Sequence, residues 1–378
     1  MDTIDNQYII KEEISDEFSY KYLVEDNTNH KKYIAKVQNL EKEKNIAPYD
    51  FESQLKFTKL ASDLNNKYLV HLITDGNGKF NFKGKVEENK RYFILDYYPN
   101  GQLSEYIEKL EALKELHAKY IFDKILRGVK ALHDAGICHR DIKPENILLD
   151  ENFNPILTNF WISIRFKSES GEIYTLEDCA GTSHYMCPQM KANKPYKGDK
   201  ADIYSLSILL LYLVNGLEQN KETINIGKFS KEFEELYLKM NSENEDERTT
   251  IDEILKYKWF DEIRNEDKNI EKEINNIFSL KRQLLLNEQN TLDYKYNIIK
   301  KINNDAYYER YLVKDIESEK QYIAAIRGNI EGIDNNEKYD FNHEVKITEM
   351  ASELNNPYII HLENYGTGIF IYKKRLKK

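Results

Sequence analysis

The spacing of apolar residues divides the chain into two kinds of segment. Up to about residue 95, short runs rich in Tyr, Ile and Val alternate with Asn/Asp turns, which is typical of β-strands. One segment there, FESQLKFTKLASDL, instead has helical spacing. From 101 to 260 helical spacing dominates, as in AKYIFDKILRGVKALHDAG, which we expect Gly136 to terminate. The pattern predicts a small sheet-rich lobe followed by a larger helical lobe.

A repeated stretch of sequence follows the helical region. ASDLNNKYLVHL at 61–72 matches ASELNNPYIIHL at 351–362, and with the upstream segments about 80 residues are duplicated. Between the copies, Ile and Leu recur at helical intervals among Glu, Lys and Asn, which predicts a charged helix, solvated or partly docked. The expected order is a first domain at 8–260, with a small lobe at about 8–95 and a large lobe at about 101–260, a helical linker at 261–290 and a partial repeat of the small lobe at 291–378.

Size and charge narrow the classes of protein that fit this pattern. At 378 residues and 44.9 kDa the chain has room for one large domain and a smaller one. A net charge of −10 argues against a general nucleic-acid binder, and the C-terminal KKRLKK is expected to be a solvated tail. The longest apolar run, YSLSILLLYLV, is too short to cross a bilayer and should form a buried helix. We expect neither nucleic acid nor membrane among the partners.

The cysteines and the N-terminus indicate the compartment. Cys138, Cys179 and Cys187 are odd in number and widely spaced, which suggests neither a disulfide framework nor a zinc site. The N-terminal MDTIDNQYII carries acidic residues where a signal peptide needs positive charge. Both features favour an intracellular, cytoplasmic protein.

The segment HRDIKPENILLD at 139–150 contains the pattern HRDxKxxN. It resembles the catalytic loop of eukaryotic protein kinases, in the form of the serine/threonine branch. The resemblance extends from Tyr8 to Phe260 through further segments in the family's order: IAKV, RYFILDYYPNGQL, GTSHYMCPQ, DIYSLS and DERTTIDEILKYKWF. It implies an α+β, bilobal protein-kinase-like fold, with a small antiparallel β-sheet lobe and a larger helical lobe. The helical linker and a second, partial β-rich small lobe would follow.

The resemblance implies roles for three residues of this loop. Asp141 stands where the family's aspartate accepts the proton of a substrate hydroxyl. Lys143 matches the lysine that neutralises the transferred phosphate, and Asn146 matches an asparagine that holds a metal ion. The implied partner is a protein, as a serine/threonine substrate or as a binding partner, and the implied cofactor is ATP.

The resemblance also implies a nucleotide site in the small lobe. Lys36 in IAKV is similar to the strand lysine that contacts the α- and β-phosphates. Leu95 takes the gatekeeper place, and the backbone from Asp96 to Tyr98 is expected to face the adenine.

The partner of Lys36 is ambiguous in the sequence. Glu52 is available on the neighbouring helix, but the internal repeat aligns Glu344 with Gln54. Either Glu52 faces Lys36, or the partner has been neutralised to Gln54.

Asn159 is the main departure from the family pattern. The family's metal-binding Asp of the DFG motif comes thirteen residues after the metal-binding Asn, and thirteen residues after Asn146 stands Asn159. An amide lacks the negative charge through which carboxylates usually hold Mg²⁺, so weak or absent Mg²⁺ binding is expected. Trp161 replaces the motif's glycine, and a bulky side chain restricts the backbone, so a stiffer segment is expected.

Two further departures point the same way. The glycine loop that covers the nucleotide in the family has no counterpart, because no glycine precedes Gly76, and Asp16 and Glu17 would add like charge beside phosphates. Gln189 replaces the family's glutamate opposite Arg248, so Arg248 is either solvated or hydrogen-bonded to Gln189.

The second copy cannot bind ATP by the family's mechanism, because Ala325 stands in the place of Lys36 and no hinge or catalytic loop follows. It is either a truncated duplication without function or a regulatory lobe that docks on the first domain or on a partner.

Taken together, the losses favour a pseudokinase that signals by binding nucleotide or partners and by conformational change. The alternatives are an active serine/threonine kinase with altered metal use and a structural protein that never meets nucleotide. Arg140 can pair with a phosphate if one is added to the segment 159–189. The hydroxyls available there are those of Ser168, Ser170, Thr175 and Thr182.

Overall fold

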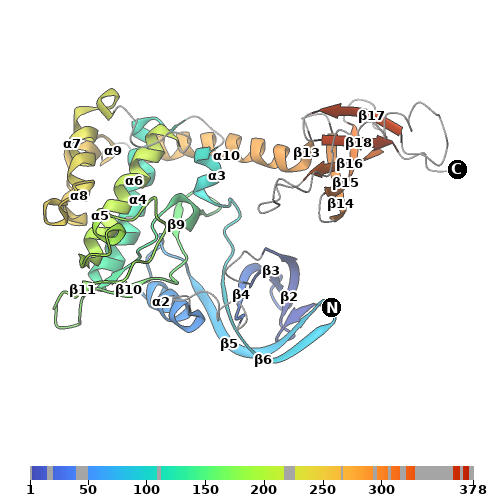
Figure 1. Cartoon of the computed structure of the whole chain (residues 1–378), viewed down its shortest axis with the longest axis horizontal. Helices are drawn as coiled ribbons and strands as arrows, with labels where there is room; N and C mark the ends of the chain where they lie inside the picture. Colours follow the sequence, from blue (N-terminus) through green and yellow to red (C-terminus); the bar gives the residue numbers. More distant parts are fainter. Residues whose placement is uncertain are drawn as a thin grey trace, which may run out of the picture. The chain divides into compact units, whose positions relative to one another are not determined.

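The protein is seen in a computed structural model that describes residues 2–14, 20–39, 50–108, 112–216, 226–264, 267–292, 296–304, 308–315, 321–327, 361–366 and 369–373. The chain divides into two compact units, residues 1–279 and 280–378 (Figure 1). Within the described ranges, no helix is both long enough and apolar enough to cross a bilayer.

The small lobe of the first unit is a closed antiparallel barrel. Its strands are β1 (Thr3–Ile4), β2 (Tyr8–Glu13), β3 (Tyr20–Asp26), β4 (Lys32–Val37), β5 (Leu72–Phe82) and β6 (Lys85–Asp96). They lie in the order β1-β2-β3-β4-β6-β5, and β1 pairs with β5 to close the barrel. Alternate residues such as Tyr22 and Val24 in β3 are buried inside, as the period of a strand requires. The antiparallel small lobe predicted from the sequence is therefore present.

Helix α2 (Phe51–Asp63) lies between β4 and β5 in the chain. The carboxylate of Asp50 caps its first turn by accepting the backbone N–H groups of Glu52 (3.2 Å) and Ser53 (3.1 Å). The buried face of the helix includes Gln54, which is only 4% exposed. A polar side chain is thus carried into the interior.

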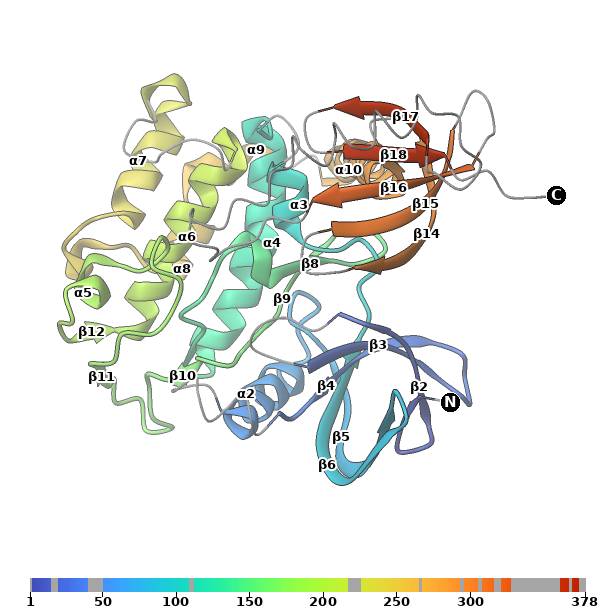
Figure 2. The ribbon, with the colours of Figure 1, turned by 45° about the vertical axis from the view of Figure 1, so that its right-hand side comes forward.

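The large lobe is helical, as predicted. Its elements are α3 (Leu103–Glu108), α4 (Glu115–Asp134), β7 (Ile137–Cys138), β8 (Ile147–Leu149), β9 (Pro155–Leu157), β10 (Ile164–Arg165), β11 (Thr175–Leu176), α5 (Pro188–Lys191), β12 (Tyr196–Lys197), α6 (Gly198–Asn215), α7 (Lys231–Met240) and α8 (Ile251–Leu255). Helix α4 packs against α6 and α8 (Figure 2). Helix α6 is buried throughout residues 201–215, which confirms that YSLSILLLYLV forms a core helix.

Gly136 ends α4 as predicted. Its φ of +72° lies in the left-handed region, and a Cβ there would come within 2.7 Å of the carbonyl oxygen of Lys167. The glycine therefore allows the chain to turn directly from α4 into β7.

The charged segment after residue 260 forms α9 (Asp261–Arg264) and α10 (Asp267–Asn290). Three apolar residues of α10 at four-residue spacing, Ile270, Ile274 and Phe278, are 2%, 1% and 1% exposed. Of the two states expected for this helix, partial docking is the one observed within the first unit.

The second unit contains one six-stranded antiparallel sheet. Its strands are β13 (Thr291–Leu292), β14 (Tyr296–Asn304), β15 (Tyr308–Asp315), β16 (Gln321–Arg327), β17 (His361–Gly366) and β18 (Ile369–Lys373). They lie in the order β13-β14-β15-β16-β18-β17, which repeats the strand order of the first barrel. Ala325 lies in β16, while the KKRLKK tail falls almost entirely outside the described residues.

Arg248 is one of the largest fully buried side chains of the large lobe, at 2% exposure. Its Nη2 donates to Oε1 of Gln189 at 2.7 Å, and its Nε donates to the carbonyl oxygen of Ser242 at 2.8 Å. The guanidinium also lies 5.1 Å from the ring centroid of Tyr204. Of the two alternatives for Arg248, hydrogen bonding to Gln189 is the one found.

We predict that Gln189→Ala destabilises the protein by about 1.5–3 kcal/mol, the usual range for losing a hydrogen bond to a charged group. Gln189→Glu is the matched control, because its carboxylate keeps an acceptor and adds a charge opposite Arg248. Urea denaturation should rank Gln189→Ala as clearly the less stable variant. An unfolding midpoint for Gln189→Ala equal to that of the parent would contradict this account of Arg248.

Candidate functional site

One buried carboxylate holds the loop between β7 and β8. Asp202 of α6 is fully buried, and its two oxygens accept the backbone N–H groups of His139 and Arg140, each at 2.8 Å. Nε2 of His133 lies 2.9 Å from the same carboxylate. These bonds from Asp202 fix the loop backbone, and Arg140 within it has a φ of +68°.

His139 joins this loop to the strand that precedes Asn159. Its Nδ1 accepts the backbone N–H of Asp141 (3.3 Å), so Nε2 carries the proton and donates to the carbonyl oxygen of Thr158 (3.0 Å). Burial lowers the pKa of His139, because the charged imidazolium would lose its hydration. The ring also packs edge-on against Phe160 at 5.1 Å between centroids. His139 is therefore a neutral structural link.

Asp141, Lys143 and Thr182 form a compact polar cluster. Oδ1 of Asp141 accepts two hydrogen bonds from Thr182, one from its hydroxyl at 2.6 Å and one from its backbone N–H at 3.1 Å. Nζ of Lys143 donates to the Thr182 hydroxyl oxygen at 2.6 Å and lies 3.3 Å from Oδ2 of Asp141. The base and the cation implied by the resemblance are thus adjacent, and Thr182 holds both in place.

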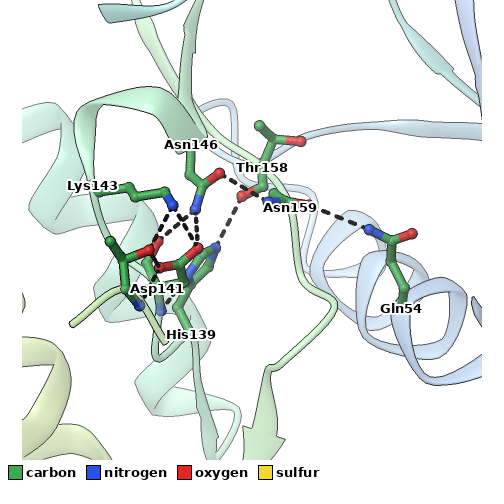
Figure 3. A network of polar contacts seen from close by, with 8 residues as sticks. Gln54, His139, Asp141, Lys143, Asn146, Thr158 and Asn159 are labelled. Atoms are coloured by element: carbon green, nitrogen blue, oxygen red, sulfur yellow. Dashed lines mark hydrogen bonds and ion pairs between the residues drawn. The ribbon is translucent and has the colours of Figure 1, made fainter. Parts of the chain in front are cut away.

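Three neutral amides extend from this cluster across to α2 (Figure 3). Asn146 donates from Nδ2 to Oδ2 of Asp141 at 2.7 Å, and its Oδ1 accepts from Nδ2 of Asn159 at 2.9 Å. Oδ1 of Asn159 in turn accepts from Nε2 of Gln54 at 3.3 Å. We call Gln54, Asn159 and Asn146 the amide chain.

The chemistry of Asp141 fixes the direction of the whole amide chain. An ionised carboxylate and a backbone carbonyl only accept hydrogen bonds, so the group of Asn146 that faces both of them must be its NH₂. The carbonyl oxygen of Asn146 then points at Asn159, which has to donate, and Asn159 presents its own carbonyl oxygen to Gln54. Both oxygens that stand at the family's metal positions are therefore engaged by N–H donors.

The backbone of Asn159 also suits an asparagine. Its φ of +74° lies in the left-handed region, which Asn tolerates better than most residues. The following Phe160 is fully buried, and Trp161 is half-buried in a turn without a positive φ. The stiffening expected from Trp161 stays a prediction.

Glu52 does not face the site, which corrects its place among the nucleotide-binding residues. Its carboxylate is half-exposed on the outer face of α2 and binds Nε of Arg91 at 2.8 Å. Two positions along a helix differ by about 200° in direction, so Gln54 points inward where Glu52 points outward. Of the two alternatives, Gln54 is the residue that faces Asn159.

The remaining predicted residues lie along β4, β6 and the segment that follows. Lys36 in β4 is 6% exposed, with Nζ 5.9 Å from the ring centroid of Phe93 in β6. Leu95 is buried and pairs with Ile34 of β4. Asp16 and Glu17 fall outside the described residues.

His71 binds Asp96, the last residue of β6, and Tyr98, which follows the strand. The Asp96 carboxylate lies 3.1 Å from Nδ1 of His71, whose backbone N–H donates to the Tyr98 hydroxyl at 3.3 Å. Burial raises the pKa of Tyr98. The side chains of Asp96 and Tyr98 are thus occupied. Of the backbone groups proposed to meet an adenine, the N–H of Asp96 donates to the carbonyl oxygen of His71 at 3.2 Å, and the carbonyl oxygen of Tyr98 accepts from the N–H of Gly101 at 3.4 Å.

Arg140 already has an anionic partner in the segment 159–189. Its Nη1 lies 2.6 Å from the Asp178 carboxylate, and its Nε donates to the carbonyl oxygen of Ile162 at 2.6 Å. Tyr196 supplies a third acceptor at 3.0 Å. The sequence interpretation, which assigned Arg140 to a phosphate, missed Asp178. The acidic pair Glu177–Asp178 shortly before GTSHYM was the available signal.

The hydroxyls proposed for modification are placed differently from one another. Thr182 is bound to Asp141 and Lys143, while Ser168 and Ser170 lie with their oxygens 2.8 Å apart. Thr175 is exposed in β11. Modification of any of them stays a prediction.

Comparison with known proteins agrees with this geometry. The family model described as "Protein kinase domain" matches residues 15–260. The chain belongs to the eukaryotic protein kinase family. Over 188 residues it is 33% identical to CBL-interacting protein kinase 15 of Oryza sativa subsp. japonica, covering 46% of this chain and 43% of the relative. Over 128 residues it is 38% identical to maternal embryonic leucine zipper kinase of Xenopus tropicalis, covering 34% of this chain and 19% of the relative.

The chain thus spans less than half the length of these curated relatives. They place this protein kinase chain with the serine/threonine kinases, whose members generally use ATP and Mg²⁺. In the described part of the chain, no group of three or more His, Cys, Asp and Glu side chains is arranged to hold a metal ion.

The pair of Arg140 and Asp178 predicts an ordered segment without phosphorylation. Asp178→Asn keeps the size of the side chain but removes the charge opposite a buried guanidinium. We expect severalfold faster amide hydrogen exchange across residues 166–186 of unphosphorylated Asp178→Asn. Asp246→Asn, which alters an exposed acid, is the control and should exchange like the parent. Equal exchange in the parent and Asp178→Asn would show that this ion pair does not order the segment.

His139 predicts a pH dependence of stability. Because its pKa is lowered in the folded protein, the unfolded chain binds more protons below the ordinary histidine pKa of about 6.5. The stability that neutral His139 contributes is complete above about pH 6.5 and is lost as the pH falls toward the lowered pKa of the folded state. His139→Tyr keeps an aromatic ring and an O–H donor but does not titrate there. Denaturation at pH 7.5 and at pH 5.5 should show that the free energy of unfolding falls more in the parent than in His139→Tyr. Equal falls in both proteins would argue against a neutral His139.

Proposed function

We propose that this kinase-family chain is a pseudokinase, which binds a nucleotide or a protein partner without Mg²⁺-dependent phosphotransfer and signals through its conformation. The amide chain of Gln54, Asn159 and Asn146 carries this proposal. The three residues satisfy one another and contain no carboxylate, so the polar groups need no metal ion to be stable in the cleft.

A magnesium ion would fit this arrangement poorly. Each carbonyl oxygen that could coordinate it, those of Asn146 and Asn159, already accepts a hydrogen bond, at 2.9 and 3.3 Å, and neither carries the negative charge that would neutralise the ion. Mg²⁺ sheds its waters reluctantly and is usually held by one or two carboxylates plus phosphates. The carboxylate of Asp141 is itself bonded to Asn146, Lys143 and Thr182. We therefore propose no catalytic step that passes through a metal ion.

One observation favours a second candidate, a slow serine/threonine kinase. Asp141, Lys143 and Thr182 retain a connected arrangement in which a substrate hydroxyl could replace that of Thr182 beside the base. In that case Asp141 would take the hydroxyl proton while the substrate oxygen attacks the γ-phosphorus of ATP, and ADP would leave. Without the charge at residue 159, such turnover is expected to be orders of magnitude below that of a complete site.

The second unit is proposed to be a partial copy of the small lobe that serves as a protein-binding module. The identical strand order of its sheet and of the first barrel supports this proposal. Since Ala325 replaces the lysine found at Lys36, we assign it no nucleotide site. Its partner can be the first unit or another protein.

A phosphotransfer assay on the full chain tests the proposal. We predict that the parent incorporates no more phosphate into a generic Ser/Thr substrate than Asp141→Ala does. Asn159→Asp should gain roughly tenfold to a hundredfold over that background with Mg²⁺, because it adds a carboxylate and cannot donate to Asn146, whose oxygen is released.

Asn159→Leu is the matched control, since it also releases Asn146 but supplies no charge. It should remain at the background of Asp141→Ala. Parent activity that Asp141→Ala abolishes would replace the pseudokinase proposal with the slow kinase.

A further inference from the structure

Helix α10 lies beyond the segment that matches the family model, which ends at residue 260. Its residues up to Ser279 nevertheless belong to the first unit, and their apolar stripe is buried. The last member of that stripe, Phe278, is 1% exposed. A helix outside the family domain thus contributes to the packing of the large lobe.

Phe278 packs against two aromatic rings of the large lobe. Its ring centroid lies 5.1 Å from that of Tyr106 in α3 and 5.8 Å from that of Phe153. Tyr106 and Phe153 are themselves 6.2 Å apart, which completes a triangle of rings. The apolar seam between Phe278 and α3 holds no space for a water molecule. The ring of Tyr106 therefore packs against Phe278 with no water between them.

The hydroxyl of Tyr106 points out of this triangle toward the hinge, which we define as residues 96–101, from the last residue of β6 toward α3. It donates to the carbonyl oxygen of Asn100 at 2.8 Å. Tyr106 is 1% exposed, so this bond is shielded from water. A fixed ring thereby fixes one peptide group of the hinge.

The same part of the hinge is bonded to the strand that follows Asn146. The side-chain NH₂ of Asn100 donates to the carbonyl oxygen of Asp150 at 2.7 Å. The backbone N–H of Asn100 donates to the carbonyl oxygen of Leu149 at 3.3 Å. The N–H of Leu149 returns a bond to the carbonyl oxygen of Gly101 at 2.9 Å. Hinge and β8 are thus fastened together around Asn100.

We propose that Tyr106 is a positioning residue for the hinge and that α10, through Phe278, holds it in place. The chain of contacts runs from Phe278 to Tyr106, from Tyr106 to Asn100 and from Asn100 to Leu149. It gives the segment after the family domain a direct influence on the edge of the nucleotide cleft. Its effect on nucleotide affinity rests on the proposed function, whereas its effect on hinge order does not.

Tyr106→Phe in the full chain is the sharpest test, because it removes only the hydroxyl and keeps the ring that packs on Phe278. Amide hydrogen exchange of Asn100, Gly101 and Leu149 should become roughly fivefold faster, since the carbonyl of Asn100 loses its buried donor. The dissociation constant of ATP, measured by titration calorimetry in EDTA, should rise by about the same factor. Exchange equal to the parent's at these amides would overturn the proposal.

Two truncations in α10 separate positioning from general stability. Phe278→Ala and Ile270→Ala both delete buried side chains of one helix, but Ile270 lies about 12 Å away along its axis. Both should lower the melting temperature, and only Phe278→Ala should speed exchange at the hinge. Equal acceleration by both variants would show a merely structural role and overturn the proposal. If the parent binds no ATP, the nucleotide-binding part of the proposed function fails, and the exchange measurements alone decide the role of Tyr106.

Discussion

A carboxylate can only accept hydrogen bonds, and this constraint at Asp141 organises the centre of the molecule. It turns the NH₂ of Asn146 toward Asp141 and the carbonyl oxygen of Asn146 toward Asn159. Asn159 then has to donate in that direction and accept from Gln54 on α2. In this way a chain of neutral hydrogen bonds joins the catalytic loop of the large lobe to the helix of the small lobe. A kinase that bound Mg²⁺ here would need the same oxygens for the ion.

The scaffold around this centre is retained even where the site has changed. Asp202 still fixes the backbone at His139 and Arg140, and His139 still spans to Thr158. Elsewhere neutral or acidic residues satisfy buried groups: Gln189 accepts from Arg248, and Asp178 pairs with Arg140. Both buried cations therefore have partners among the protein's own residues. The proposed loss of metal binding is therefore compatible with an intact fold.

The two-lobed fold and the catalytic loop could be predicted from the sequence, because HRDxKxxN and the helical and strand periods are local signals. The direction of Gln54 could not, since the rotation of α2 depends on which face packs inward. The helical spacing of Gln54 with Thr58 and Ala61, which are also buried, was the available hint that Gln54 faces inward. The hydrogen-bond directions among the amides and the partner of Arg140 required three-dimensional contacts. The docking of α10 also required them, because the sequence showed its apolar stripe but not Tyr106, the residue against which the stripe packs.

The affinity of the parent protein for ATP, with Mg²⁺ and with EDTA, tests the central claim most directly. The amide chain provides no carboxylate for the ion, so the two dissociation constants should agree to within about twofold. Binding that is about tenfold tighter or more with Mg²⁺ would contradict the account, because the ion would then be held despite the engaged oxygens of Asn146 and Asn159.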